Sequence, residues 1–119
     1  MVVDDDADML TLCGKALEMA GYEATLALSG EEAVSFIERR TPDLIVLDLN
    51  MPGIDGWTVA ALIRKHKQTA HIPILVITGL MENAEQAARR AGATSFCLKP
   101  FDARRLVNEV RRLCPLPGT

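Results

Sequence analysis

The sequence predicts an α/β domain with a five-stranded parallel sheet and five helices, and three observations lead to this fold class. Apolar and amphipathic segments alternate five times along the chain, as strands connected by helices do. Several apolar runs are short and bounded by polar or turn residues, which is typical of strands buried on both faces of a sheet. The segments between successive runs are long enough for a helix, and such connections join parallel strands by right-handed crossovers.

Turn, breaker and capping residues place the elements along the chain. Gly21 and Gly92 end helices, Ser29 and Asp102 begin helices as N-caps, and Pro42 interrupts the chain before a strand. The expected strands cover residues 1–3, 23–28, 44–47, 74–77 and 95–98. The expected helices cover residues 7–20, 30–40, 56–65, 82–91 and the segment that follows Asp102. Strands and helices are therefore expected to alternate throughout.

The apolar residues of two helices indicate which faces are buried. In the first helix they repeat at the spacing of a buried stripe, and they are Met9, Leu12, Cys13, Ala16 and Leu17. Leu10 falls outside this stripe, so we expect it on the helix surface. The fourth helix directs only alanines to the core, namely Ala84, Ala87, Ala88 and Ala91. Because an alanine buries little apolar area, we expect this helix to be weakly held and free to shift.

Length and composition limit the classes of protein to which the chain can belong. It has 119 residues, of which 49% are hydrophobic, and this is enough for one domain with its own core. The net charge of −3 gives no general attraction to nucleic acid. Three widely separated cysteines indicate neither a disulfide framework nor a zinc site. With no apolar stretch of membrane-spanning length and no visible signal peptide, the sequence favours a cytoplasmic protein.

Polar residues of different chemical kinds follow four of the apolar runs. Asp4 and Asp5 follow the first strand, Asp48 the third, Thr78 the fourth and Lys99 the fifth. Because ligands of open α/β sheets bind beyond the carboxyl ends of the strands, we expect these side chains to converge on one rim. Carboxylates bind a hard cation, whereas a hydroxyl and an ammonium group hold an anion. The combination indicates a site for Mg2+ and a phosphoryl group.

The segments that carry these residues resemble the receiver domain of two-component response regulators. The matching segments are residues 2–6, 48–56, 76–79, 91–93 and 96–101, and the resemblance extends over essentially the whole chain. It implies a flavodoxin-like fold, which is a three-layer sandwich with strand order 2-1-3-4-5. It also implies a receiver domain at residues 1–113, followed by a C-terminal tail or the start of a linker at residues 114–119.

The resemblance further implies a role for each residue at the rim. Asp48 is the expected phosphoacceptor, with Thr78 and Lys99 as its catalytic neighbours. The expected cofactor is Mg2+, for which Mn2+ or Ca2+ could substitute, and its expected ligands are Asp4, Asp5, Asp48 and the backbone carbonyl of Asn50. Thr78 and Phe96 are the expected switch residues, and the peptide bond between Lys99 and Pro100 is expected to be cis.

The implied function is that of a signalling switch and not of an enzyme with a separate substrate. Asp48 would take a phosphoryl group from the phosphohistidine of a histidine kinase or histidine phosphotransfer protein. The change would reach the fourth helix, fifth strand and fifth helix, where an effector domain or a second copy of the chain could bind. No direct contact with nucleic acid or membrane is expected. Leu10 is a candidate docking contact for the kinase, and Leu80, which cannot orient water, favours slow loss of the phosphoryl group.

Three other interpretations are left open by the sequence. A pseudo-receiver would recognise partners without being phosphorylated, although the acids, hydroxyl and ammonium at the strand ends favour an active site. A haloacid-dehalogenase-like phosphatase needs an Asp-x-Asp pair, but the residue two positions after Asp48 is Asn50, and a cap domain does not fit in 119 residues. A flavodoxin-like flavin carrier needs a phosphate-binding loop after the first strand, where this chain has acids.

Overall fold

The computed structural model describes residues 1–79 and 83–117 of the chain. Within these residues the strands are β1 (Val2–Val3), β2 (Leu26–Ala27), β3 (Ile45–Asp48), β4 (Ile74–Thr78) and β5 (Ser95–Leu98). The helices are α1 (Ala7–Met19), α2 (Gly30–Arg39), α3 (Gly56–Lys65), α4 (Ala84–Arg90) and α5 (Ala103–Leu113). None of the helices described has the length and apolar character needed to cross a bilayer.

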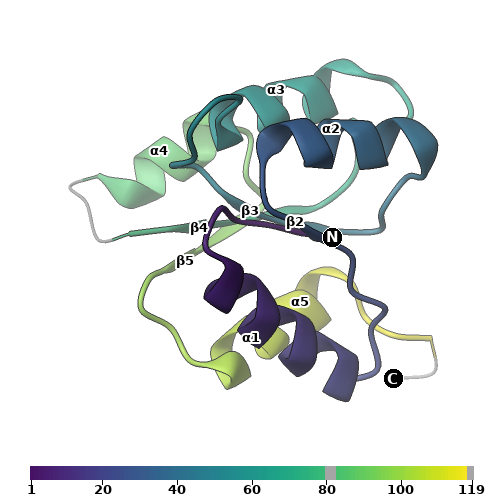
Figure 1. The fold of residues 1–119 in the computed structure, drawn as a ribbon, viewed down its shortest axis with the longest axis vertical. Helices are drawn as coiled ribbons and strands as arrows, with labels where there is room; N and C mark the ends of the chain where they lie inside the picture. The colour runs from purple at the N-terminus through teal and green to yellow at the C-terminus, as the bar shows by residue number, and fades with distance from the viewer. Residues whose placement is uncertain (80–82, 118–119) are drawn as a thin grey trace.

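The strands are all parallel and form one sheet in the order β2-β1-β3-β4-β5, which confirms the expected fold class. α1 and α5 cover one face of this sheet, and α2, α3 and α4 cover the other (Figure 1). β1 lies in the interior, with Val2 aligned to Leu26 of β2 on one side and to Val46 of β3 on the other. The result is a three-layer, flavodoxin-like sandwich whose strands all end at the same edge.

Two apolar cores separate the three layers. The core beneath α2, α3 and α4 contains Val3, Leu47 and Val76. The core beneath α1 and α5 contains their strand neighbours, among them Val2 and Val46. Successive strand residues point to opposite faces, so each interior strand supplies both cores and is buried along its length. This explains why the strands appear in the sequence as unbroken apolar runs.

The buried face of α1 differs from the expected one. Its buried residues are Leu10, Cys13, Gly14 and Leu17. Leu12, which was expected in the core, is 49% exposed. The segment contains two overlapping stripes of helical spacing, and Gly14 decides between them because the Leu26 side chain lies 3.2 Å from where a Cβ would be. The prediction that Leu10 lies on the helix surface is therefore wrong.

β2 is shorter than the expected strand at residues 23–28. Only Leu26 and Ala27 pair with β1, and β1 itself offers only Val2 and Val3. β2 lies at the edge of the sheet, so no second neighbour extends its ladder. The length of this strand is thus set by its neighbour and not by its own sequence. In contrast, α3 and β5 have the bounds that the sequence predicts.

Candidate functional site

The carboxyl edge of the sheet holds polar residues that are far apart in the sequence. Asp4 follows β1, Asp48 ends β3, Thr78 ends β4 and Lys99 follows β5. These four strands are consecutive neighbours in the sheet, so their ends form a continuous rim. Ion pairs join Lys99 to both Asp4 and Asp48 across this rim. The strand order thus brings together side chains separated by up to 95 positions.

Lys99 bonds to two carboxylates at once. Its Nζ donates to Oδ2 of Asp4 at 2.9 Å and to Oδ2 of Asp48 at 3.3 Å. The Asp4 side chain is fully buried and that of Asp48 is 5% exposed, whereas that of Lys99 is 24% exposed. The ammonium group therefore lies between the two acids and the solvent. The peptide bond that joins Lys99 to Pro100 is cis.

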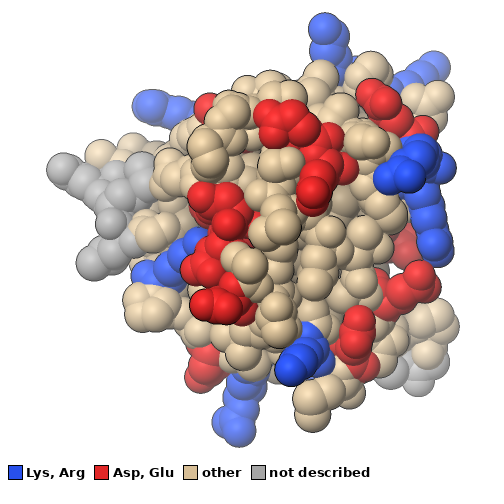
Figure 2. Space-filling model, in the orientation of Figure 1, with Lys and Arg blue, Asp and Glu red and all other residues tan. Residues whose placement is uncertain are grey.

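Asp4, Asp5 and Asp48 form an oxygen-rich cluster. One carboxylate oxygen from each residue lies within 4.8 Å of the other two. Asp5 is exposed, so the cluster is open to solvent on its side. Figure 2 shows acidic side chains gathered on this side of the molecule, between the layer of α2 and α3 and the helix α1. Carboxylate oxygens at this spacing fit the ligand preference of a hard divalent cation.

The loop after Asp48 folds back against the strand that it leaves. Asn50 N donates to Oδ1 of Asp48 at 3.1 Å, and Gly56 N donates to the carbonyl oxygen of Leu49 at 3.1 Å. A Cβ at Gly56 would lie only 2.1 Å from the carbonyl oxygen of Asp48, so the close approach requires glycine. These contacts keep the backbone of Asn50 beside the acidic cluster.

Thr78 and Phe96 connect the rim to the interior. The Thr78 side chain is fully buried. The backbone carbonyl oxygen of Thr78 accepts a hydrogen bond from Lys99 N at 2.7 Å. Phe96 is half-buried and packs against the core beneath α2, α3 and α4. Gly79 faces open space, since a Cβ there would meet no atom within 4 Å. Leu80 lies outside the described residues, so the slow dephosphorylation inferred from it stays a prediction.

The residues at the strand ends belong to a segment that matches a known protein family. Residues 1–111 match the family model described as the response regulator receiver domain. The chain belongs to this family. Membership confirms the resemblance found in the sequence, and it favours a receiver domain of a two-component response regulator over a phosphatase or a flavin carrier.

Known relatives of this receiver domain are similar along almost its entire length. The DNA-binding dual master transcriptional regulator RpaA of Synechocystis sp. is 36% identical, with 95% of this chain and 47% of the relative covered. The phosphate regulon transcriptional regulatory protein PhoB of Pseudomonas aeruginosa is 37% identical, with 99% and 52% covered. The receiver domain thus spans about half the length of these relatives.

Solved structures of similar sequence have the same fold. A putative response regulator from Chloroflexus aurantiacus is 38% identical with a TM-score of 0.89, and the match covers 94% of this chain and 93% of the other. The chemotaxis protein CheY4 of Vibrio cholerae is 29% identical with a TM-score of 0.86, and 94% of each chain is covered. The fold of the receiver domain is therefore similar to the folds of these two proteins.

The charged groups of the receiver site shift one another's protonation. Burial raises the pKa of the Asp48 carboxyl; the Asn50 N–H bond and the charge of Lys99 act in the opposite direction, and the net shift is upward. Burial lowers the pKa of Lys99, but the bond to Asp4 and the charge of Asp48 outweigh it, and the net shift is again upward. Lys99 is therefore cationic at neutral pH and partly offsets the two buried acids.

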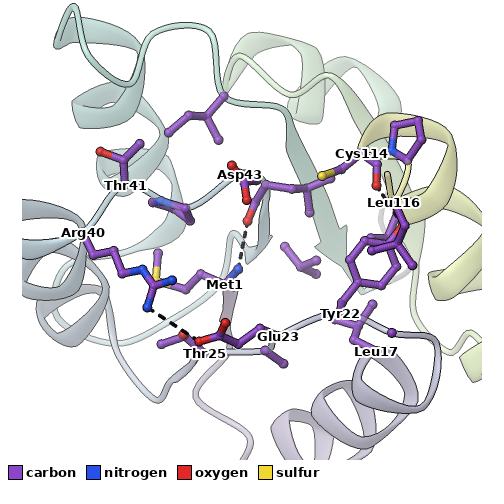
Figure 3. A pocket seen from close by; sticks show the side chains of 18 of the residues that line it. Met1, Leu17, Tyr22, Glu23, Thr25, Arg40, Thr41, Asp43, Cys114 and Leu116 are labelled. Carbon is purple, nitrogen blue, oxygen red and sulfur yellow. Dashed lines mark hydrogen bonds and ion pairs between the residues drawn. The ribbon is translucent and has the colours of Figure 1, made fainter. Parts of the chain in front are cut away.

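A cavity of about 630 Å³ lies at the other edge of the sheet, near the amino ends of the strands. Figure 3 shows its polar contacts: the Met1 ammonium donates to the carbonyl oxygen of Leu44 at 2.9 Å, and Arg40 pairs with Glu23 at 3.6 Å. The cavity lining includes none of the strand-end acids and not Lys99. The cavity is therefore separate from the candidate site at the carboxyl edge.

One residue beside the site is missed by the sequence prediction. Ser29 begins the segment Ser-Gly-Glu-Glu, which has the form of a capping box, with an N-cap serine and a glutamate three residues later. Ser29 Oγ accepts from Glu32 N at 3.1 Å, and the Glu32 carboxylate accepts from Leu28 N at 2.8 Å, so Glu32 completes the cap. Glu31 instead accepts a hydrogen bond from Ile54 N in the loop after Asp48. The sequence did carry a signal for Glu31, because a capping box needs one glutamate and two follow Ser29.

Proposed function

We propose that this receiver domain is a phosphoacceptor switch that takes a phosphoryl group onto Asp48 from the phosphohistidine of a histidine kinase or histidine phosphotransfer protein. The observation that carries the proposal is the place of Asp48 at the carboxyl edge, where it belongs to the acidic cluster and pairs with Lys99. Family membership supports it. The domain modifies its own side chain, so the proposed role is signalling and not catalysis on a separate substrate.

The residues around Asp48 fit a divalent cation. Asp4, Asp5 and Asp48 offer carboxylate oxygens within 4.8 Å of one another, and the backbone carbonyl of Asn50 is the further proposed ligand. An all-oxygen donor set suits Mg2+, for which Mn2+ or Ca2+ could substitute. When bound, the cation would neutralise the charge that develops on the phosphoryl oxygens.

The chain itself supplies the nucleophile and two donors. An Asp48 carboxylate oxygen forms a bond to phosphorus while the bond from phosphorus to the kinase histidine nitrogen breaks, and that electron pair goes to the nitrogen. Lys99 Nζ, which lies 3.3 Å from Asp48 Oδ2, is placed to donate to a phosphoryl oxygen instead. The Thr78 hydroxyl is proposed to donate to another phosphoryl oxygen. The residues thus act by positioning and by offsetting charge.

Asp48→Asn tests the assignment. Incubation with acetyl phosphate and Mg2+ should add one phosphoryl group to the wild type and none to the variant, because an amide oxygen is a poor nucleophile. Asp43→Asn removes an exposed acid near the opposite edge and should be labelled normally. Intact-mass spectrometry measures the outcome. Labelling of Asp48→Asn to the wild-type level would refute the assignment, and an unlabelled wild type would favour the pseudo-receiver.

The proposed output is a rearrangement of the face formed by α4, β5 and α5. Thr78 ends the strand next to β5, and Phe96 on β5 packs against the core, so both residues link the rim to this face. Phe96 has no hydroxyl, and its proposed switch therefore depends on packing alone. Binding of beryllofluoride should change the Phe96 χ1 rotamer, as measured by NMR. An unchanged rotamer would show that Phe96 is a core residue and not a switch residue.

The proposed output partner is an effector domain or a second copy of the chain, bound to the face of α4, β5 and α5. RpaA and PhoB carry the names of transcriptional regulators, and this chain covers only about half of each. We assign residues 1–113 to the receiver domain and residues 114–119 to a tail or the start of a linker. Direct contact with nucleic acid is not proposed, since the net charge is −3. The free cysteines suit the proposed cytoplasmic location.

A further inference from the structure

Glu31 lies outside the acidic cluster, yet its carboxylate reaches the loop that joins β3 to α3. It belongs to the first turn of α2, and its Oε1 accepts a hydrogen bond from Ile54 N at 2.8 Å. The two residues are 23 positions apart, so the bond joins separate parts of the fold. The Ile54 bond lowers the pKa of Glu31, which is therefore an ionised acceptor at neutral pH.

Within the described residues, the other hydrogen bonds of this loop lie at its two ends. At the β3 end, Asn50 N is bonded to Asp48 Oδ1. At the α3 end, Asp55 Oδ1 accepts from Thr58 N at 2.9 Å and caps the helix. The bond from Glu31 to Ile54 is made between these ends, at the outer part of the loop. It is a hydrogen bond that joins this outer part to α2.

The backbones of α2 and the loop are in close contact around the Glu31 bond. A Cβ added to Gly30 would lie 2.1 Å from the carbonyl oxygen of Ile54. Gly53 has a φ of +73°, and a Cβ there would lie 2.8 Å from Glu31 Oε1. Glycine at both positions removes the side chains that would separate the two segments. The fit is specific to a loop held against the start of α2.

We propose that Glu31 is a positioning residue, which holds the loop so that the Asn50 carbonyl faces the cation site. The inference rests on the proposed function, in which the Asn50 carbonyl is a ligand of the cation. Glu31 would not touch the cation or the phosphoryl group. Its effect would pass through the Ile54 amide and the loop backbone to Asn50, as a residue outside a metal site orients the ligands within it.

The first measurement is amide hydrogen exchange in the metal-free protein. Glu31→Ala should raise the exchange rate of the Ile54 amide at least tenfold and should also speed exchange at Asn50. Glu31→Gln keeps an acceptor oxygen and should restore most of the protection. Glu38→Gln changes the same charge at an exposed position of the same helix and should leave both amides unchanged. Unaltered exchange at Ile54 and Asn50 in Glu31→Ala would overturn the proposal.

The second measurement is Mg2+ affinity, followed by the fluorescence of Trp57, which is the single tryptophan of the chain and lies in the first turn of α3. Glu31→Ala should weaken Mg2+ binding by about tenfold, whereas Glu31→Gln should stay close to the wild type. Equal weakening by Glu31→Gln and Glu38→Gln would show a general charge effect and overturn the positioning role. A wild type that binds no Mg2+ would instead overturn the proposed function, while the exchange data still decide whether Glu31 fixes the loop.

Discussion

At the scale of single residues, two leucines of α1 differ in how far their side chains are exposed to solvent. Leu10 is 4% exposed and packs in the core, whereas Leu12 is 49% exposed. A partner can contact Leu12 while α1 stays folded, but it cannot contact Leu10. α1 begins directly after the acidic residues of the rim, so Leu12 lies nearer the site than Met19 at the other end of the helix. Leu12 therefore takes the place of Leu10 as the candidate contact of a histidine kinase.

Leu12→Asp should slow phosphoryl transfer from the cognate kinase by about tenfold, which corresponds to a loss of about 1.4 kcal/mol of binding free energy. The reason is that a carboxylate replaces an apolar contact at the interface. Labelling by acetyl phosphate should not change, because the site itself is intact. Met19→Asp alters an exposed apolar residue at the far end of α1 and serves as the control. Equal slowing of labelling by the kinase and by acetyl phosphate would show that Leu12 is not a contact of the kinase.

Residue chemistry also decides what the sequence could predict about the site. Asp4, Asp48 and Lys99 were predictable because charged groups that follow buried strands must lie at the edge of the sheet. Glu31 was visible only as a second acid after Ser29, and its role was not predictable, because its partner is the backbone amide of Ile54 and the sequence does not show which loop amide a side chain meets. The stripe of α1 was ambiguous for a related reason, since the choice between two faces depends on the contact of Leu26 with Gly14.

At the scale of elements, α4 is held by small side chains and by an arginine of α3. The buried residues of α4 and its C-cap are Ala84, Ala88 and Ala91, as the sequence predicts for three of its four alanines. Arg64 donates from Nε and from Nη2 to the carbonyl oxygen of Gly92, at 3.1 and 2.9 Å. It also donates from Nη1 to the carbonyl oxygen of Ile72 at 2.6 Å. Arg64 thus joins the end of α4 to α3 and to the start of β4.

Arg64→Ala should lower the free energy of unfolding by about 2–3 kcal/mol, since hydrogen bonds to a charged group are worth about 1.5–3 kcal/mol. The amides of α4 should then exchange before those of α2, because the alanines alone bury little area. Arg90→Ala removes an exposed arginine from α4 and should change stability by less than about 0.5 kcal/mol. Urea unfolding and hydrogen exchange measure both effects. Equal loss of protection in α2 and α4 would contradict a local role for Arg64.

Elements with local signals were placed correctly from the sequence. The bounds of α3 follow from Asp55, whose side chain caps the helix, and from the polar residues after Lys65. β2 was placed too long because a strand extends only as far as its neighbour pairs with it, and that neighbour is β1, with two residues. Local chemistry therefore defines the start of α3, whereas the length of β2 at the sheet edge depends on the tertiary structure.

At the scale of the whole molecule, the buried Asp48 at the rim opposes folding in the absence of a cation. Asp4 and Asp48 are both buried, and Lys99 is their shared ion-pair partner. Because burial raises the pKa of Asp48 above its value in the unfolded chain, the stability contributed by its protonated form is present at low pH and is lost as pH rises through the folded pKa. At neutral pH the ionised Asp48 therefore costs stability.

Asp48→Asn should raise the free energy of unfolding of the metal-free protein at pH 7 by about 1 kcal/mol, the ordinary size of a single-residue effect. Asparagine keeps an oxygen for Lys99 or for Asn50 N but removes the charge next to Asp4. Mg2+ at 100 times its dissociation constant should then stabilise the wild type by about 2.7 kcal/mol and the variant by much less, so the order of stability reverses. Thermal unfolding in EDTA and in Mg2+ measures both states. A variant less stable than the wild type in EDTA would show that Asp48 supports the fold instead of being held at a cost for binding the cation and the phosphoryl group.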